Sequence, residues 1–254
     1  MKNEEKINKY FKSKKMLFAA WSCESKFFPS TSSWYESLKK IFGEVIIFDP
    51  QKQMYLSGKK TRDKRFLEIL KKEKPDYLFR LYHPDEFGVG VLFDIKKISP
   101  KTKTICYFTD DETHFPYISR YMVPLFCDFA LTAQKASVND YKKEGIKNAF
   151  FTYGINPELF RPKNLEKKYD VTFVGNPKAN RYEIINFLKR QGINLKIFGS
   201  GWSRYKDLKE IYRGQPNNEE LVNIINQSKI NLCFTRNIFG KTQIKGRVFE
   251  VGAC

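Results

Sequence analysis

Two cations and a carboxylate lie close together near residue 250, in the stretch Lys-Gly-Arg-Val-Phe-Glu. Lys245, Arg247 and Glu250 fall within about one and a half turns of a helix that we expect to open near Lys245. Lysine and arginine beside a helix N-terminus can hold a diphosphate, because guanidinium groups and free amides both donate to phosphate oxygens. Glu250 could then accept hydrogen bonds from both hydroxyls of a ribose. The alternative is an Arg–Glu pair on a solvated helix, which contributes only a few tenths of a kcal/mol.

Glycines end two strand-like runs in the same half of the chain, and a ligand can approach the backbone closely at a glycine. Gly175 and Asn176 end one run, with Arg181 at the start of the helix that should follow. Gly199 ends the next run, and Arg236 follows a third. We interpret these residues as further parts of a phosphate-binding site. A tight turn between a strand and a helix explains such glycines without any ligand.

A second group of reactive side chains, in the sequence Thr-Asp-Asp-Glu-Thr-His, comes just after a strand-like run in the first half of the chain. Asp110, Asp111 and His114 are candidates for catalysis, because neighbouring carboxylates repel and one pKa can rise enough for proton transfer at neutral pH. His114 could act as a base or orient an acceptor. Asp110 and Glu112 also offer oxygen ligands for Mg²⁺ or Mn²⁺. The alternative is a solvated acidic loop that caps a helix.

The other residues suited to recognition are aromatic. Trp21, Trp34 and Trp202 could each stack on a sugar or a base, although we expect core packing at Trp34. His83, the second histidine of the chain, precedes Pro84, and we interpret it as structural.

Strand-like and helix-like runs alternate along the chain, which predicts parallel sheets covered by helices on both faces. A helix should begin after Ser33 as N-cap, with Glu36 three residues later, and another should follow an Asn180/Glu183 capping box. We expect strands at residues 16–22, 44–48, 77–81, 104–108, 126–131, 171–174, 195–198 and 230–234, and further helices at 61–72, 181–191 and from 217.

The runs form two series separated by a proline-containing and charged stretch before residue 169. The fold class is therefore α/β, with two Rossmann-like, doubly wound domains at residues 1–158 and 159–254. The second series supplies only three or four strands, so we expect this domain to be incomplete at its C-terminus.

The stretch from Lys245 through Arg247 and Glu250 to Cys254 resembles the KxRxFE-x-x-AC motif of bacterial GT-B glycosyltransferases of the CgeB-like (spore maturation protein) type, within the group 1, family-4-like superfamily. Supporting blocks stand in the expected order at residues 156–162, 170–175, 197–202 and 228–232. The resemblance is good over residues 150–254 and only architectural before them.

This resemblance implies a metal-independent GT-B enzyme, of hexosyltransferase-like activity, without a cofactor. It would transfer a sugar from a nucleotide-sugar donor to the hydroxyl of a glycan or lipid-linked acceptor during cell-surface glycan or glycolipid synthesis. Arg247 and Lys245 would contact the diphosphate and Glu250 the ribose, with the backbone near Gly175 and Gly199 around the donor. An alternative is an inactive, truncated relative that binds a nucleotide or glycan without transfer.

Composition and charge limit the kinds of partner and the cellular location that we expect for this protein. The 254 residues carry 46 Lys and Arg against 28 Asp and Glu, a net charge of +18 that is spread along the chain. A nucleic-acid binder gathers such charge in a stripe, so we expect no nucleic acid, and anionic partners such as sugar nucleotides or a peripheral anionic membrane surface. The apolar runs are strand-sized and no secretory signal is visible, which predicts a cytoplasmic protein, peripheral at the inner face of the plasma membrane. Five cysteines without metal spacing are expected to be reduced thiols.

Overall fold

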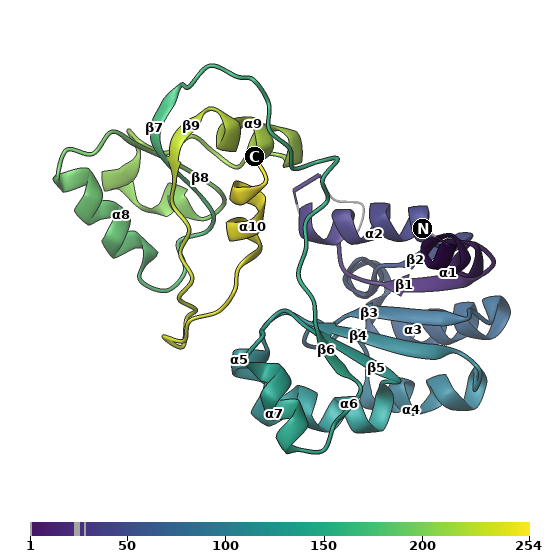
Figure 1. Ribbon diagram of the computed structural model, residues 1–254. Coiled ribbons are helices and arrows are strands. Elements are labelled where there is room, and N and C mark those ends of the chain that lie inside the picture. Colours follow the sequence, from purple (N-terminus) through teal and green to yellow (C-terminus); the bar gives the residue numbers. More distant parts are fainter. Residues whose placement is uncertain (1, 23–25, 28) are drawn as a thin grey trace. The chain divides into compact units, whose positions relative to one another are not determined.

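The computed structural model describes residues 2–22, 26–27 and 29–254, and it divides into two compact units (Figure 1). The N-terminal unit ends at Tyr153 and the C-terminal unit begins at Gly154, slightly before the boundary expected after residue 158. Each unit contains its own parallel sheet and its own core.

The N-terminal unit is built on a six-stranded sheet in the order β2-β1-β3-β4-β5-β6, and all neighbouring strands are parallel. This confirms the parallel α/β arrangement that the alternating runs predict. Strand β1 begins one residue before the strand expected at residues 16–22 and ends three residues before it. The strands are β1 (Lys15–Ala19), β2 (Glu44–Phe48), β3 (Tyr77–Leu81), β4 (Lys103–Phe108), β5 (Phe129–Thr132) and β6 (Ala149–Phe151).

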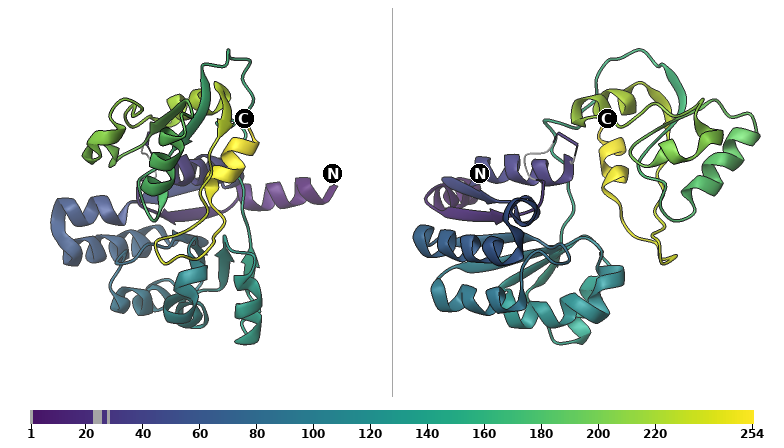
Figure 2. Two further views of the ribbon diagram at one scale, coloured as in Figure 1. Left: turned by 90° about the vertical axis from the view of Figure 1, so that its left-hand side faces the viewer. Right: turned by 180° about the vertical axis from the view of Figure 1, so that it is seen from behind.

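Helices cover both faces of this sheet (Figures 1 and 2). Helices α1 and α2 pack on one face of β1 and β3, and α3 and α4 on the other. Each fully buried Leu or Phe in these layers contributes about 1.5–3 kcal/mol. The helical segments are α1 (Lys2–Lys12), α2 (Pro29–Ile41), α3 (Pro50–Glu73), α4 (Val89–Ile98), α5 (Asp111–His114), the π-helical turn η1 (Phe115–Ser119), α6 (Arg120–Phe126) and α7 (Ser137–Lys143).

Two helix starts differ from the prediction. Helix α2 begins at Pro29, so Ser33 lies inside the helix and is not its N-cap; proline is favoured at the first helical position because its φ is already helical. Helix α3 begins after Asp49, whose side chain accepts from the Lys52 N–H, well before residue 61. It has two limbs, since Gly58 interrupts it at φ +77°.

The C-terminal unit contains a three-stranded parallel sheet in the order β8-β7-β9, formed by Tyr169–Val174 (β7), Leu195–Phe198 (β8) and Ser228–Asn231 (β9). Helix α8 (Arg181–Arg190) and the 3₁₀ turns η2 (Trp202–Arg204) and η3 (Lys206–Leu208) pack on one face. Helices α9 (Asn218–Asn226) and α10 (Gly246–Gly252) pack on the other (Figure 1).

The helix starts of this unit can be compared with the sequence signals. A complete capping box joins Asn217 and Glu220 at the start of α9. The box expected at Asn180 does not form, because the Asn180 side chain makes no cap hydrogen bond. Strand β9 lies slightly earlier than residues 230–234. Helix α10 opens directly after Lys245, as predicted.

Candidate functional site

The carboxyl ends of β7 and β8 approach each other at two glycines. A Cβ atom on Gly199 would lie 2.5 Å from the Gly175 carbonyl oxygen, and Gly199 also has a φ of +120°. The Gly175 N–H donates to the Phe198 carbonyl at 2.9 Å, and the buried Trp202 indole donates to the Gly175 carbonyl at 2.6 Å. The close spacing of the two strand ends is therefore a structural reason for glycine at both positions. Trp202 is a core residue.

Arg181 lies against this glycine turn. Its Nη1 donates to the Asn176 carbonyl at 2.9 Å, and its guanidinium carbon is 5.5 Å from the centre of the Phe173 ring. The Arg181 Nε is buried and has no hydrogen-bond partner among the described residues. Burial lowers the pKa of Arg181, and the neighbouring positive charge of Arg247 lowers it further. A buried donor beside a second cation is a position that an anion would stabilise.

Arg247 brings that second cation from α10. Its Nη1 lies 2.5 Å from Glu250 Oε2, and the two side chains are 23 % and 8 % exposed. Neither of these atoms has hydrogen-bond geometry with a described residue, and the same holds for Arg247 Nε. Arg247 and Glu250 thus form the i,i+3 pair that the sequence offered as the alternative to a diphosphate site. The pair is, however, largely buried and does not lie on a solvated helix face. The Nε donor of Arg247 therefore lacks a hydrogen-bond partner among the described residues, whereas Nη1 is paired with Glu250.

The remaining predicted donor residues lie around this pair or apart from it. Lys245 is the N-cap residue of α10, and its Nζ donates to the Gln243 side chain. Asn176 accepts a hydrogen bond from the Ser200 hydroxyl at 3.0 Å. Arg236 lies in an exposed turn, where its Nε donates to the Gly240 carbonyl at 3.1 Å. The structure therefore places Gly175, Asn176, Gly199 and Arg181 at one turn, pairs Arg247 with Glu250, and gives Arg236 a separate turn. The link between the first two groups is electrostatic, since the charge of Arg247 lowers the pKa of Arg181.

Cys233 is a neighbour of this cluster that the sequence did not single out. Its Sγ lies 3.8 Å from the Arg247 carbonyl oxygen. Burial raises the pKa of the Cys233 thiol, so the group is neutral at physiological pH. A cysteine without any motif spacing carries no sequence signal for such a position. Cys106, Cys127, Cys233 and Cys254 are all free thiols, and Cys23 lies outside the described residues.

The catalytic candidates of the N-terminal unit separate into different environments. Asp111 is 1 % exposed and accepts hydrogen bonds from Ser119 at 2.5 Å and Tyr141 at 2.9 Å. Asp110 is half-buried just before α5, and the His114 ring lies 5.9 Å from the Tyr82 ring. Asp111 thus connects α5 to η1 and α7, whereas Asp110 and His114 retain access to solvent.

The buried carboxyl of Asp111 makes stability depend on pH. Burial raises its pKa to about 6, although hydrogen bonds from Ser119, Thr132 and Tyr141 lower it in part. An unfolded aspartate has a pKa of about 3.9, so stability is lost as pH rises from about 4 to above 6, by about 3 kcal/mol in total. Asp111→Asn should remove this loss, because an amide stays neutral and can still form hydrogen bonds with the surrounding hydroxyls.

Urea unfolding of wild type and Asp111→Asn at pH 4.5 and 7.5 checks this expectation. The variant should gain stability relative to wild type at the higher pH. Asp111→Ala is the contrast, since the hydroxyls around the site lose their partner, and its stability should lie about 1–3 kcal/mol below that of Asp111→Asn at both pH values. If the free energies of unfolding of Asp111→Asn and wild type differ by the same amount at both pH values, the proposed burial effect is contradicted.

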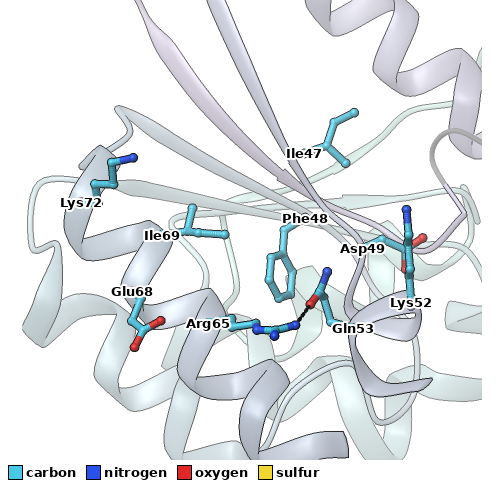
Figure 3. A pocket seen from close by; sticks show the side chains of 9 residues that line it. All are labelled: Ile47, Phe48, Asp49, Lys52, Gln53, Arg65, Glu68, Ile69 and Lys72. Carbon is cyan, nitrogen blue, oxygen red and sulfur yellow. Dashed lines mark hydrogen bonds between the residues drawn. The ribbon is translucent and has the colours of Figure 1, made fainter. Parts of the chain in front are cut away.

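Two hollows lie away from these residues. One, of about 600 Å³, is bounded by β2 and the two limbs of α3, and Figure 3 shows Arg65 pointing to Gln53, with 2.7 Å between Nη1 and Oε1. The other, of about 500 Å³, lies in the C-terminal unit beside Phe198 and α9. Neither is lined by a predicted site residue. Among the described residues, no group of three His, Cys, Asp or Glu could hold a metal ion, and no helix is long and apolar enough to cross a membrane.

Comparison with known proteins agrees with this architecture. Residues 181–254 match the family described as "Glycosyl transferase-like". No curated protein matches the chain in sequence. Among solved structures, an alpha-glucosyltransferase in complex with UDP and a 13-mer DNA containing a central A:G mismatch is 10 % identical, with a TM-score of 0.56 over 95 % of this chain and 78 % of that one.

Two further similar structures are UDP-N-acetylglucosamine 2-epimerases. The protein from Rickettsia bellii is 12 % identical, with a TM-score of 0.53 over 86 % of this chain and 73 % of that one. The protein from Neisseria meningitidis, bound to UDP-GlcNAc, is 10 % identical, with a TM-score of 0.53 over 85 % and 76 %. Such low identity shows the fold alone. The chain has the two-domain, Rossmann-like GT-B fold, and the segment that carries Arg181, Arg247 and Glu250 is glycosyl transferase-like in sequence.

Proposed function

We propose that the chain is a glycosyltransferase that binds a nucleotide-sugar through Arg181 and Arg247 in its C-terminal unit. The observation that carries this proposal is the pair of neighbouring, largely buried guanidinium groups whose Nε donors lack partners among the described residues. Two adjacent cations repel each other, and a diphosphate would both neutralise them and accept from their free donors. The glycosyl transferase-like segment and the UDP-bound and UDP-GlcNAc-bound structural neighbours support this ligand class.

In the proposed reaction, the bond between the anomeric carbon and the β-phosphate oxygen breaks. A bond forms between that carbon and the acceptor oxygen, whose proton passes to a base. Negative charge develops on the leaving nucleoside diphosphate, and Arg247, Arg181 and Lys245 would stabilise it. Because cations supply this stabilisation, we propose that the enzyme needs no metal ion.

The finer assignment rests on the CgeB-like motif, which lies inside the matched segment at residues 245–254. We infer a hexosyl donor and a glycan or lipid-linked acceptor of the cell surface, with the reaction on the cytoplasmic side of the membrane. The net charge of +18 favours anionic acceptors and headgroups. Glu250 remains our candidate for the ribose hydroxyls and Asp110 and His114 for the acceptor side.

Calorimetry tests the proposal directly. Nucleoside diphosphates (UDP, GDP and ADP) and the matching nucleosides are titrated in the presence and absence of EDTA. At least one diphosphate should bind about 100-fold more tightly than its nucleoside, since a charged hydrogen-bonded contact contributes 2–5 kcal/mol. EDTA should not change this affinity or the rate at which the diphosphate is released from its sugar nucleotide.

Three results would contradict parts of this proposal. If diphosphates bind no more tightly than nucleosides, the proposed donor site is wrong. Abolition of turnover by EDTA would remove the metal-independent mechanism. Tight binding with no release of diphosphate in the presence of any sugar acceptor would favour the inactive relative.

A further inference from the structure

The loop at residues 82–88, between β3 and α4, is held by buried charges. Arg62 of α3 and Arg80 of β3 are each 1 % exposed, and Glu86 within the loop is 6 % exposed. Arg80 Nη2 contacts Glu86 Oε1, and Arg62 Nη1 donates to the Asp85 carbonyl at 2.8 Å. Both guanidinium groups also lie within 6 Å of the centre of the Phe87 ring, at 5.7 and 5.9 Å.

This loop conformation is costly to maintain. Asp85 has a left-handed φ of +65°, a conformation that a non-glycine residue adopts only with backbone strain. Burying the Arg80–Glu86 pair adds a desolvation cost, and Arg80 Nε and Glu86 Oε2 have no hydrogen-bond partner among the described residues. A loop that only connects a strand to a helix requires neither a left-handed non-glycine residue nor a buried ion pair. Strain of this kind concentrates where a side chain must be presented in one orientation.

The loop presents the His83 ring. His83 Nδ1 lies 2.8 Å from the Pro84 carbonyl oxygen. Because a carbonyl can only accept, Nδ1 carries the proton and Nε2 of the neutral ring is an acceptor. The Trp21 ring, which follows β1, lies 5.4 Å from the His83 ring at an angle of 57°. Both side chains are half-buried at the carboxyl ends of neighbouring parallel strands, where open α/β sheets bind ligands.

We propose that Trp21 and His83 bind a sugar ring of the acceptor. The indole would pack against the apolar face of a pyranose, and a sugar hydroxyl would donate to His83 Nε2. This inference rests on the proposed function and names the acceptor class as a glycan, recognised at its ring. It also assigns a role to His83, which the sequence led us to interpret as structural.

Imidazole NMR provides the test, because the chain has only two histidines. Methyl β-glycosides of glucose, galactose, mannose and N-acetylglucosamine are added at millimolar concentrations, without nucleotide. At least one should shift the His83 Cε1–H signal in a saturable manner. Trp21→Ala should abolish that shift. His83→Asn keeps an amide donor for the Pro84 carbonyl but lacks Nε2, and should weaken glycoside binding, measured by saturation transfer, by about tenfold.

His114→Asn assigns the two imidazole signals, and an unchanged His114 signal in Trp21→Ala verifies that the variant is folded. Tyr55→Ala is the matched control, because it removes an aromatic ring that is 77 % exposed on α3, and it should leave glycoside binding unchanged. The proposal is overturned if no glycoside shifts the His83 signal, or if the shift persists in Trp21→Ala. Diphosphate binding without any glycoside shift would overturn this assignment alone, whereas loss of diphosphate binding with the shift retained would overturn the donor site.

Discussion

Replacing Arg247 by alanine is expected to weaken binding of the preferred nucleoside diphosphate by at least about 100-fold. The variant removes the buried Nε donor, which has no hydrogen-bond partner among the described residues, and one of the two cations whose charges interact. The affinity of the matching nucleoside should stay unchanged, because it carries no phosphate. Isothermal titration calorimetry of both ligands measures the difference.

The control must separate lost recognition from lost stability. Arg247→Ala leaves Glu250 buried without the guanidinium that lies 2.5 Å away. The double variant Arg247→Ala with Glu250→Gln should recover thermal stability, since the amide carries no charge, but should not recover diphosphate binding. Arg190→Ala, at the exposed end of α8, should bind like wild type. A single Arg247→Ala variant within threefold of the wild-type affinity would exclude Arg247 from the site.

The second large effect is expected on stability. Glu86→Ala should lower the free energy of unfolding of the N-terminal unit by about 3–5 kcal/mol, because Arg80 would remain as an uncompensated charge in the core. The double variant Arg80→Leu with Glu86→Leu should recover most of this loss, since neither residue then carries a charge. Urea unfolding measures both.

An exposed carboxylate provides the comparison for Glu86. Glu44 pairs with Lys15 at 3.0 Å, and the Glu44 side chain is 54 % exposed. Glu44→Ala should therefore change stability by less than about 1 kcal/mol. If Glu86→Ala costs no more than Glu44→Ala, the buried pair does not hold the loop at residues 82–88.

The sequence predicted the sheets well because their strands are short, apolar and buried. It missed the first limb of α3, whose residues around Tyr55 and Leu56 are largely exposed and which ends at Gly58. A helical segment whose apolar residues are exposed has no buried face, so the spacing of its apolar residues does not predict it. It also placed the α2 start at Ser33, since a capping-box spacing is short enough to occur by chance inside a helix.

The candidate sites were predictable only where one helix carries the residues. Arg247 and Glu250 are three positions apart, so their contact follows from helical geometry. Arg181 becomes a neighbour of Arg247 only through the packing of α8 and α10 around one sheet. Nothing in the local sequence distinguishes Asp111, which is fully buried, from Asp110, which is only half-buried. The pairing of Arg80 with Glu86 also depends on how the chain returns after β3.

The contact between Gly175 and Gly199 has a consequence for how this protein can evolve. Strand spacing here is set by two positions without side chains, and the Asn176 carbonyl that follows holds the Arg181 guanidinium. The placement of that charge is thus a property of the main chain. Surface residues of α8 and α9 can diverge freely while the geometry persists, so distant descendants should keep the glycine contact and the position of the guanidinium long after overall sequence similarity has faded.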